Sequence, residues 1–394
     1  MRIFMRGLNA CAMRKADIAR YKDSLVAAGH ELVNDPAKSD TVLVWTCAFR
    51  QDYRENSIRV LNEYRDKNKK RVVACGCLPS INPQILAERF EGESFEWKND
   101  RQALAKLFNS NLPETQRYFV EKAIDIPIEE YKARNPGVKT THCDQFVKLF
   151  ITEGCNFKCT YCAEILAFPP FKSFPLESVV NKFKKVMNEF GEKRVILHGD
   201  CVGEYGKEIG SSIVELIENL LSTASGVKIG IRNLYPGNFI EYYDELMRFI
   251  KNGDLFLLET PIQSASDDVL KLMGRHYRQR DLKRIFDGLV GSGFKEFETH
   301  ILVGYPSETE AQFQETVDFI TRYRPKYVLI SGYMGSPLLK SADLPGQIDE
   351  EIIRARVLEA YEAINKEGVI CNYNMCDLIK ERFESSYVDG LIYQ

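Results

Sequence analysis

Three cysteines lie within eight residues of one another, Cys155, Cys159 and Cys162, in a C-x3-C-x2-C arrangement. They directly follow the apolar run 146–151, which is typical of a buried strand. Three thiolates at this spacing can hold three corners of a cubic iron–sulfur cluster. Because such a cluster ordinarily takes four cysteine ligands, one iron keeps a coordination position for something else. The spacing therefore predicts an iron–sulfur cluster that binds a further ligand.

A zinc site is the alternative interpretation of the same three cysteines. Zinc sites usually combine two C-x2-C pairs, or cysteine pairs with histidine pairs. No histidine lies next to this triad. The spacing favours the cluster, and a structural metal-binding protein without enzymatic activity stays the non-enzymatic alternative.

Length and composition indicate a globular protein of two or three domains. The chain has 394 residues, of which 44% are hydrophobic and 28% charged, and its net charge is −3. No apolar run approaches the ~20 residues that cross a bilayer, and the first strand-like run is too short for a signal peptide. We therefore expect a cytoplasmic protein with no membrane partner. The odd number of cysteines, 11, favours reduced thiols over a disulfide framework.

Residues 1–112 alternate short β-branched runs with helical patterns. The run 41–46 is typical of a buried strand, and 53–69 is a charged amphipathic helix. Buried strands separated by helices predict a flavodoxin-like parallel sheet with helices on both faces. Such sheets bind ligands at the carboxyl ends of their strands.

Three cysteines of this first domain, Cys11, Cys47 and Cys77, each lie just past a predicted strand or in the loop that follows it. Because parallel strands end at one edge of their sheet, the three thiols can meet there and hold a second metal centre. Cys75 lies short of the edge, so Cys77 is preferred as the ligand. The alternative is three unrelated cysteines, since cysteine is commonly buried as a small hydrophobe.

Residues 113–144 carry three prolines and no clean period, and they are predicted to be a linker. Residues 145–366 contain six βα units in one direction, which predicts a partial (β/α)6 relative of the eight-stranded barrel. The cysteine triad follows its first strand, at the functional C-terminal face. Residues 367–394 are predicted to be a short tail, in which Cys371 and Cys376 are structural rather than a ligand pair. The predicted barrel strands are 146–152, 194–197, 227–231, 255–258, 297–303 and 327–330.

Taken together, these motifs resemble the radical S-adenosylmethionine (SAM) enzymes and, within them, the methylthiotransferases. The triad, with Tyr161 between its last two cysteines, is similar to the cluster motif of that superfamily. Cys11, Cys47 and Cys77 are similar to the ligands of the methylthiotransferases' second cluster. The resemblance covers residues 1 to about 366 and continues through the segments 196–206, 261–275 and 301–310.

The resemblance implies two [4Fe-4S] clusters, SAM, and an electron donor such as flavodoxin or ferredoxin. In that chemistry the open iron binds the amino and carboxylate groups of SAM, and one electron splits SAM to methionine and a 5′-deoxyadenosyl radical. The radical takes hydrogen from an unactivated C–H bond, which no ordinary side chain can do. The second cluster delivers sulfur, and another SAM can methylate it.

The resemblance also suggests which residues contact SAM. Gly199 allows close approach of the backbone, and the Asp200 carboxylate can accept hydrogen bonds from the SAM ammonium group. Gln263 and Ser264 can bond the ribose or the carboxylate of SAM, and Tyr161 is a further expected SAM contact. For the polar residues the alternative role is capping of strand ends.

Departures from the family pattern bear on the substrate. Arg14 and Trp45 stand where asparagine is usual, and His300 replaces a usual aspartate. Residues 367–394 are too few to form the family's C-terminal RNA-binding TRAM barrel. With a net charge of −3, we expect a peptide or small-molecule substrate and only weak binding of bulk tRNA.

Two other enzymatic functions remain open at this point. One is methylthiolation of tRNA or of a ribosomal protein, because tRNA is not excluded. The other is a radical SAM reaction without methylation, or one in which the auxiliary cluster donates no sulfur.

Overall fold

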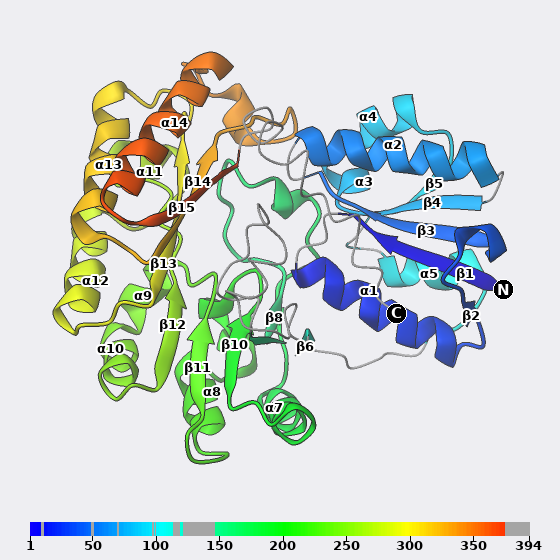
Figure 1. Ribbon diagram of the computed structural model, residues 1–394, viewed down its shortest axis with the longest axis horizontal. Helices are drawn as coiled ribbons and strands as arrows, with labels where there is room; N and C mark the ends of the chain where they lie inside the picture. Colours follow the sequence, from blue (N-terminus) through cyan, green and yellow to red (C-terminus); the bar gives the residue numbers. More distant parts are fainter. Residues whose placement is uncertain are drawn as a thin grey trace.

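The computed structural model describes residues 1–8, 12–48, 51–68, 71–96, 98, 100–112, 119–120 and 146–374. Its two large parallel sheets stand side by side, the first from the amino-terminal part of the chain and the second from residue 119 onward (Figure 1). The side chains of residues 12–17 are not among those described. The chain is thus built from two α/β halves, as its alternating pattern predicts.

The first sheet has the strand order β2-β1-β3-β4-β5 with every pair parallel. This is the flavodoxin-like order, so the predicted fold class is confirmed for this half. Its strands are β1 (Arg2–Gly7), β2 (Glu31–Leu32), β3 (Thr41–Thr46), β4 (Arg71–Gly76) and β5 (Glu93–Ser94).

Helices cover both faces of the first sheet, which explains why its central strand β3 is buried along its whole length. Val42 and Val44 pack with helix α2 on one face, whereas Leu43 and Trp45 pack with α1 and α5 on the other. The Trp45 ring stacks on Tyr21 of α1 at 6.0 Å between centroids, so the tryptophan fills the core. The helices are α1 (Ala12–Ala27), α2 (Gln51–Asn68), α3 (Leu78–Ile81), α4 (Pro83–Arg89) and α5 (Asp100–Phe108).

The second sheet has the order β15-β14-β13-β12-β11-β10-β7-β6. All neighbours are parallel except β6, which pairs antiparallel with β7. The six predicted βα strands are confirmed. The strands are β6 (Phe119–Val120), β7 (Val147–Phe150), β10 (Arg194–His198), β11 (Lys228–Ile231), β12 (Leu255–Glu259), β13 (Phe297–Val303), β14 (Tyr327–Gly332) and β15 (Ile370–Asn374).

Helices pack against one face of this curved sheet through its main apolar cluster, and the other face is the inside of a partial barrel. The inside holds a small apolar cluster formed by Phe146, Ile196 and Leu257 at the amino-terminal end of the strands. The helices are α7 (Leu176–Phe190), α8 (Ile213–Leu221), α9 (Pro236–Glu241), α10 (Tyr243–Lys251), α11 (Asp267–Leu272), α12 (Gln279–Gly291), α13 (Glu310–Tyr323) and α14 (Glu350–Lys366).

Strand β15 extends this sheet beyond residue 366, where the sequence predicts only a tail. Its residues pair in parallel with β14, from Tyr327 opposite Ile370 to Ser331 opposite Asn374. Cys371 and Tyr373 are buried while Ile370 is exposed, which is the period of a strand. The strand has only five residues, two of them asparagines, so its alternation is hard to recognise in the sequence. Cys371 is therefore a buried strand residue, and Cys376 lies outside the described residues.

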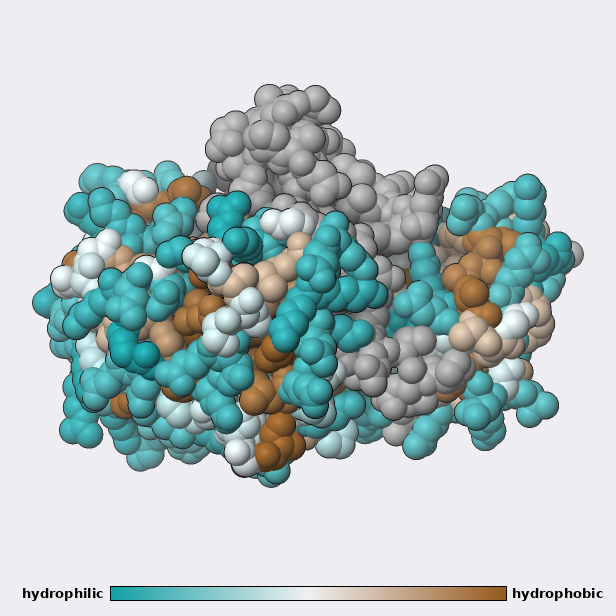
Figure 2. All heavy atoms as spheres, turned by 90° about the horizontal axis from the view of Figure 1, so that it is seen from below, coloured by the Kyte–Doolittle hydropathy of each residue, from teal (hydrophilic) through white to brown (hydrophobic). Residues whose placement is uncertain are grey.

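No helix in the described part of the chain is both long and apolar enough to cross a membrane. The face of the molecule in Figure 2 is mainly hydrophilic, with apolar side chains in limited patches.

Candidate functional site

The cysteine triad begins directly after the first barrel strand. The short strand β8 (Thr152–Glu153) follows β7, and Gly154 then turns the chain with φ of +71°. A Cβ at Gly154 would lie 2.3 Å from the carbonyl oxygen of Pro169, so only glycine fits this turn. The amide of Gly154 donates a 2.9 Å hydrogen bond to the Asp200 carboxylate, which ties the triad loop to the loop after β10.

The far side of the triad loop is docked on the turn after α11. The Thr160 amide donates to the carbonyl of Met273 at 3.1 Å, and the Thr160 hydroxyl bonds the carbonyl of Leu272 at 2.9 Å. The ring of Phe157 stacks on Tyr235 with 3.9 Å between centroids. Backbone and aromatic contacts therefore hold the loop at both ends.

The three thiols of the triad lie near one another. Burial, Glu164 and Cys159 raise the pKa of the Cys162 thiol. A fourth cysteine, Cys201, is buried after β10 and donates a hydrogen bond to Cys155, which lowers the pKa of Cys155 and raises its own. Sequence reasoning did not single out Cys201.

The donor set fits an iron–sulfur cluster in its chemistry: three cysteines on one glycine-turned loop, with free thiols. Among the described residues, no three His, Cys, Asp or Glu side chains converge as the ligands of a single metal ion would. A cubic cluster does not need that convergence, because its cysteines bind irons at separate corners. The assignment of the triad as cluster ligands stays a prediction.

The structure places Cys47 and Cys77 next to each other at one edge of the first sheet. Cys47 follows β3 and Cys77 follows β4, directly after the paired residues Thr46 and Gly76. The Cys77 amide donates to the carbonyl of Thr46 at 3.1 Å. Cys11 lies outside the described residues, although β1 ends at this same edge.

Cys75 differs from Cys77 in the way that the strand register predicts. Cys75 lies within β4, is fully buried in the core, and its sulfur is 3.6 Å from the carbonyl oxygen of Val73. Cys77 is partly exposed at the strand end. The choice of Cys11, Cys47 and Cys77 as the second ligand set stays a prediction.

This edge of the first sheet packs against the half of the chain that carries the triad. Ala48 and Cys77 contact the main apolar cluster of the second sheet, and Ile81 belongs to that cluster. Helix α3 also contacts the short helix η4 (Ala163–Leu166), which starts directly after Cys162. Cys77 and the end of the triad loop therefore lie at one interface between the halves.

An ion pair also links the two halves at this interface. Arg20 of α1 bonds Glu153 of β8 at 2.6 Å, and Lys172 lies 3.0 Å from the other carboxylate oxygen. Burial alone would raise the pKa of Glu153, but Arg20 and Lys172 outweigh it and lower the pKa. Glu153 is two residues before Cys155, so this contact links the first helix directly to the triad loop.

The inner face of the barrel carries a cluster of charged residues that sequence reasoning missed. Glu259, at the end of β12, is fully buried and accepts a 2.6 Å hydrogen bond from Nε of Arg232. His300 Nε2 lies 3.6 Å from the same carboxylate oxygen. Burial alone would raise the pKa of Glu259, but Arg232 and His300 outweigh burial and lower the pKa below its usual range. The carboxylate is therefore ionised.

Two further buried groups of this inner face have shifted pKa values. Burial and the neighbouring Glu259 raise the pKa of Glu298 to about 7. Burial, followed by Arg232 and Lys148, lowers the pKa of His198 to about 3, so this histidine is neutral. The feature of the sequence that could have predicted this charged cluster is a charged residue within or directly after an otherwise apolar strand.

The predicted SAM contacts lie around these strand ends. Gly199 follows β10, and its carbonyl accepts a 2.9 Å hydrogen bond from Nδ2 of Asn233. Gln263 follows β12 with φ of +67°, a strained conformation for a residue other than glycine. Its amide bonds the carbonyl of His300 at 2.9 Å, and its carbonyl accepts from Leu302 at 2.8 Å.

Ser264 and Tyr161 already have protein partners. Ser264 is fully buried, and its hydroxyl bonds Thr316 at 3.2 Å and accepts from the amide of Ser266 at 3.1 Å. The Tyr161 hydroxyl accepts a hydrogen bond from Arg275. For Ser264 these bonds agree with the capping alternative. The SAM roles of Tyr161, Gly199, Asp200, Gln263 and Ser264 stay predictions.

Replacing Gly199 by alanine is expected to damage the site, because the new Cβ would lie 2.1 Å from Oγ1 of the buried Thr152 and 3.0 Å from its carbonyl oxygen. Overpacking of this kind costs about 1–3 kcal/mol of stability and would displace β8. We expect a lower denaturation midpoint and weaker SAM binding, measured by denaturant unfolding and calorimetric titration. Gly291→Ala is the matched control, since nothing lies within 4 Å of its Cβ position. Equal midpoints in the two variants would contradict the prediction.

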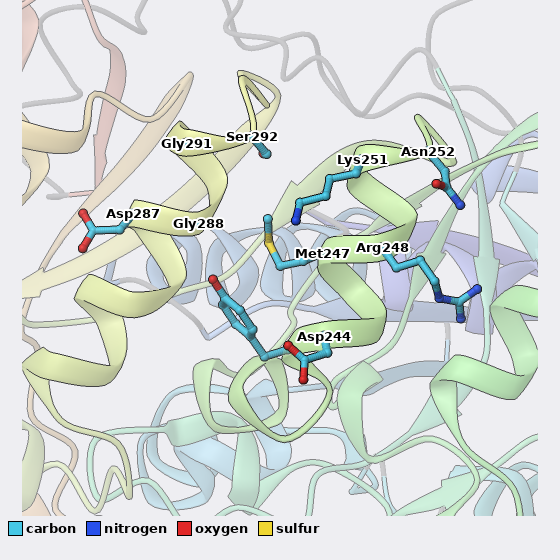
Figure 3. A pocket seen from close by; sticks show the side chains of 10 residues that line it. Asp244, Met247, Arg248, Lys251, Asn252, Asp287, Gly288, Gly291 and Ser292 are labelled. Atoms are coloured by element: carbon cyan, nitrogen blue, oxygen red, sulfur yellow. The ribbon is translucent and has the colours of Figure 1, made fainter.

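A cavity of about 490 Å³ lies elsewhere, between α10 and α12 (Figure 3). Its lining runs along both helices, from Tyr243 at the start of α10 to Ser292 directly after α12. It is lined by Tyr243, Asp244, Met247, Arg248, Lys251, Asn252, Asp287, Gly288, Gly291 and Ser292. We do not assign it to the functional site.

The sequence matches two known families, one in each half of the chain. Residues 149–320 match the Radical SAM superfamily, and residues 7–95 match the uncharacterized protein family UPF0004. The first match includes the triad, and the second includes Cys11, Cys47 and Cys77.

Several curated proteins are similar over most of the chain. A probable threonylcarbamoyladenosine tRNA methylthiotransferase of Pyrococcus horikoshii is 31% identical, covering 91% of this chain and 84% of its own. The ribosomal protein uS12 methylthiotransferase RimO of Clostridium novyi is 29% identical, covering 83% of this chain and 74% of its own.

Solved structures support the fold. The radical SAM methyltransferase TsrM of Kitasatospora setae superposes with a TM-score of 0.62 at 15% identity, over 86% of this chain and 76% of its own. At this identity the likeness concerns the fold alone. The sequence similarity is more specific, because it runs through both halves and both sets of cysteines: the chain belongs to the radical SAM methylthiotransferase family.

Proposed function

We propose that this chain methylthiolates threonylcarbamoyladenosine in tRNA. The substrate is inferred from the 31% identity, over 91% of the chain, with a probable threonylcarbamoyladenosine tRNA methylthiotransferase. Further relatives with the same name, from Pyrococcus abyssi and Methanocaldococcus jannaschii, are 30% and 28% identical. The expected peptide or small-molecule substrate has no such support, so the alternative that included tRNA is preferred.

In this proposal Cys155, Cys159 and Cys162 hold the SAM-binding [4Fe-4S] cluster, and Cys47 and Cys77 with Cys11 hold the auxiliary one. When bound, these groups and SAM supply the radical that takes hydrogen from a C–H bond and the sulfur that replaces it. The chain's task is to bring the two ligand sets to one cavity. The packing of Cys77 and Ile81 against the second half supports that arrangement.

Residues inside the barrel orient the SAM molecule and the target base. Gly199 lets the loop after β10 pack closely on Thr152, where a Cβ would clash, and so holds this loop in place for SAM. The buried Arg232–Glu259 pair supplies fixed charges at the carboxyl ends of β11 and β12. Fixed charges in a site that excludes water interact strongly with a polar ligand, so this pair suits recognition of a polar base.

The substrate can be tested directly with the purified, anaerobically reconstituted protein. We incubate it with SAM, dithionite and tRNA that carries threonylcarbamoyladenosine, then digest the tRNA and separate its nucleosides by mass spectrometry. We expect a nucleoside in which one methylthio group replaces hydrogen. The control tRNA has the same sequence with plain adenosine at that position, and it should gain no methylthio group. Formation of 5′-deoxyadenosine without a modified nucleoside would rule out this tRNA as the substrate.

A ribosomal protein is the second candidate, because RimO of Clostridium perfringens is 29% identical over 94% of this chain. The same reaction with ribosomal protein uS12 in place of tRNA separates the candidates. A methylthio group on that protein, and none on tRNA, would replace the first proposal with the second.

A further inference from the structure

Arg275 is a buried cation that no described carboxylate neutralises. It lies in the turn after α11 and is 9% exposed. Its hydrogen bonds within the described chain are with tyrosine and backbone groups, and its Nε has no hydrogen-bond partner there. A charge buried in this way is costly unless an opposite charge balances it. An anion close to the Arg275 guanidinium would therefore stabilise the protein.

Three tyrosine rings surround the guanidinium, but they do not supply that anion. The Arg275 carbon Cζ lies 5.6 Å from the ring centroid of Tyr161, 5.0 Å from that of Tyr235 and 5.8 Å from that of Tyr277. Such cation–π contacts stabilise the charge without neutralising it. Their hydroxyls act as ordinary hydrogen-bonding groups: that of Tyr161 accepts from Arg275, and that of Tyr277 donates to the carbonyl of Ile262 at 2.6 Å, which requires a protonated phenol.

The geometry places this cation beside the triad. Arg275 donates a hydrogen bond to the hydroxyl of Tyr161, the residue directly before Cys162. The same turn holds the triad loop, because Met273 accepts a 3.1 Å hydrogen bond from the amide of Thr160. Cys159 also interacts electrostatically with the guanidinium. The nearest place for an anion is therefore the triad.

We propose that the charge of Arg275 balances the anionic iron–sulfur cluster held by Cys155, Cys159 and Cys162, and thereby raises its reduction potential. Thiolate ligands give the cluster a negative charge, and reduction adds another. A fixed cation in a buried site stabilises the reduced form more than the oxidised form. The proposal rests on a cluster at the triad but not on which substrate is methylthiolated.

The carboxylate of SAM is the other anion that could occupy this place. The two sources are distinguished by measuring the cluster before SAM is added. If the cluster is the anion, Arg275 affects its potential in the absence of SAM. If the SAM carboxylate is the anion, Arg275 affects SAM binding and leaves that potential unchanged.

The test compares Arg275→Met, which removes the charge, with Arg275→Lys, which keeps it. Potentials are measured by electron paramagnetic resonance during a redox titration without SAM, using the signal that disappears in Cys155→Ala. At the wild-type midpoint potential, we expect the reduced-to-oxidised ratio in Arg275→Met to fall at least tenfold, a shift of 59 mV for one electron. Arg275→Lys should recover most of that shift.

Arg356→Met is the matched control, because Arg356 is 7% exposed but paired with the carboxylate of Glu308. Its cluster should keep the wild-type potential. An unchanged potential in Arg275→Met with full iron content overturns the proposal, including when SAM affinity falls. If Arg275→Met does not retain iron, Arg275→Gln is measured instead. Iron loss in both neutral variants and not in Arg275→Lys supports the proposal, whereas iron loss in all three overturns it.

Discussion

Replacing Cys155, Cys159 or Cys162 by alanine is expected to abolish reductive cleavage of SAM. In the proposed assignment, each variant removes one of three ligands from a cluster whose fourth iron must stay open for SAM. Cys201 also contacts the triad: it lies on the loop after β10 and donates a hydrogen bond to Cys155. Because Cys201 approaches from another loop, we do not expect it to reproduce the position of a lost triad ligand, and the expected loss is complete.

The measurement is 5′-deoxyadenosine formed from SAM and dithionite, together with iron per chain. Cys371→Ala is the control, because Cys371 is a buried residue of β15 whose sulfur lies 3.7 Å from the carbonyl oxygen of Tyr361. That variant should keep its iron and its activity. Formation of 5′-deoxyadenosine at the wild-type rate by any one triad variant would remove the triad from the active site.

The combined replacement of Cys11, Cys47 and Cys77 by alanine is expected to separate the two half-reactions. This variant should still cleave SAM, because the triad belongs to the other half of the chain, but it should transfer no sulfur. Iron content should fall by about half, since one of two clusters is lost. The measurements are 5′-deoxyadenosine, methylthio product and iron in the same sample.

Cys75→Ala is the matched control for this variant. Cys75 lies in β4, the strand that Cys77 directly follows, but it is fully buried in the core. Its replacement should leave iron content and methylthio transfer unchanged. Loss of half the iron in Cys75→Ala, or full iron in the triple variant, would mean that the auxiliary ligand set is wrong.

The sequence was sufficient to locate the main buried strands and to place Cys47 and Cys77 directly after two of them. Buried parallel strands are short β-branched runs, and such runs are easy to recognise when helices separate them. Because Cys47 and Cys77 directly follow two such runs, their adjacency follows from the parallel pairing of Thr46 with Gly76. Cys11 could not be compared in this way, because it lies outside the described residues.

The charged interior of the barrel could not be predicted from the same pattern. Glu259 and Arg232 come from different strands, and the parallel pairing of β11 with β12 brings them together. Strand β15 was missed for a related reason, since Cys371 and Tyr373 alternate with polar residues over only a few positions. Long-range pairings of this kind have no local signature.

The substrate was the least predictable feature. Net charge and the length of the last segment describe the chain as a whole, whereas recognition depends on a few groups inside the barrel. His300 illustrates the difficulty: as a departure from the family pattern it suggested a new substrate, yet in the structure it lies 3.6 Å from Glu259 and belongs to a buried charge network. A changed residue can thus contact a neighbouring side chain of the protein rather than mark a new ligand.

The order of the two sheets along the chain has a consequence for biosynthesis. All five strands of the first sheet lie within residues 1–94, and every strand of the second sheet comes later. Amino-terminal units generally fold first during translation, so Cys47 and Cys77 reach their sheet edge while the barrel is still being synthesised. Until Glu153 emerges to pair with Arg20, that edge is uncovered on the nascent chain. Iron and sulfide therefore have open access to these thiols before the second half of the protein covers them.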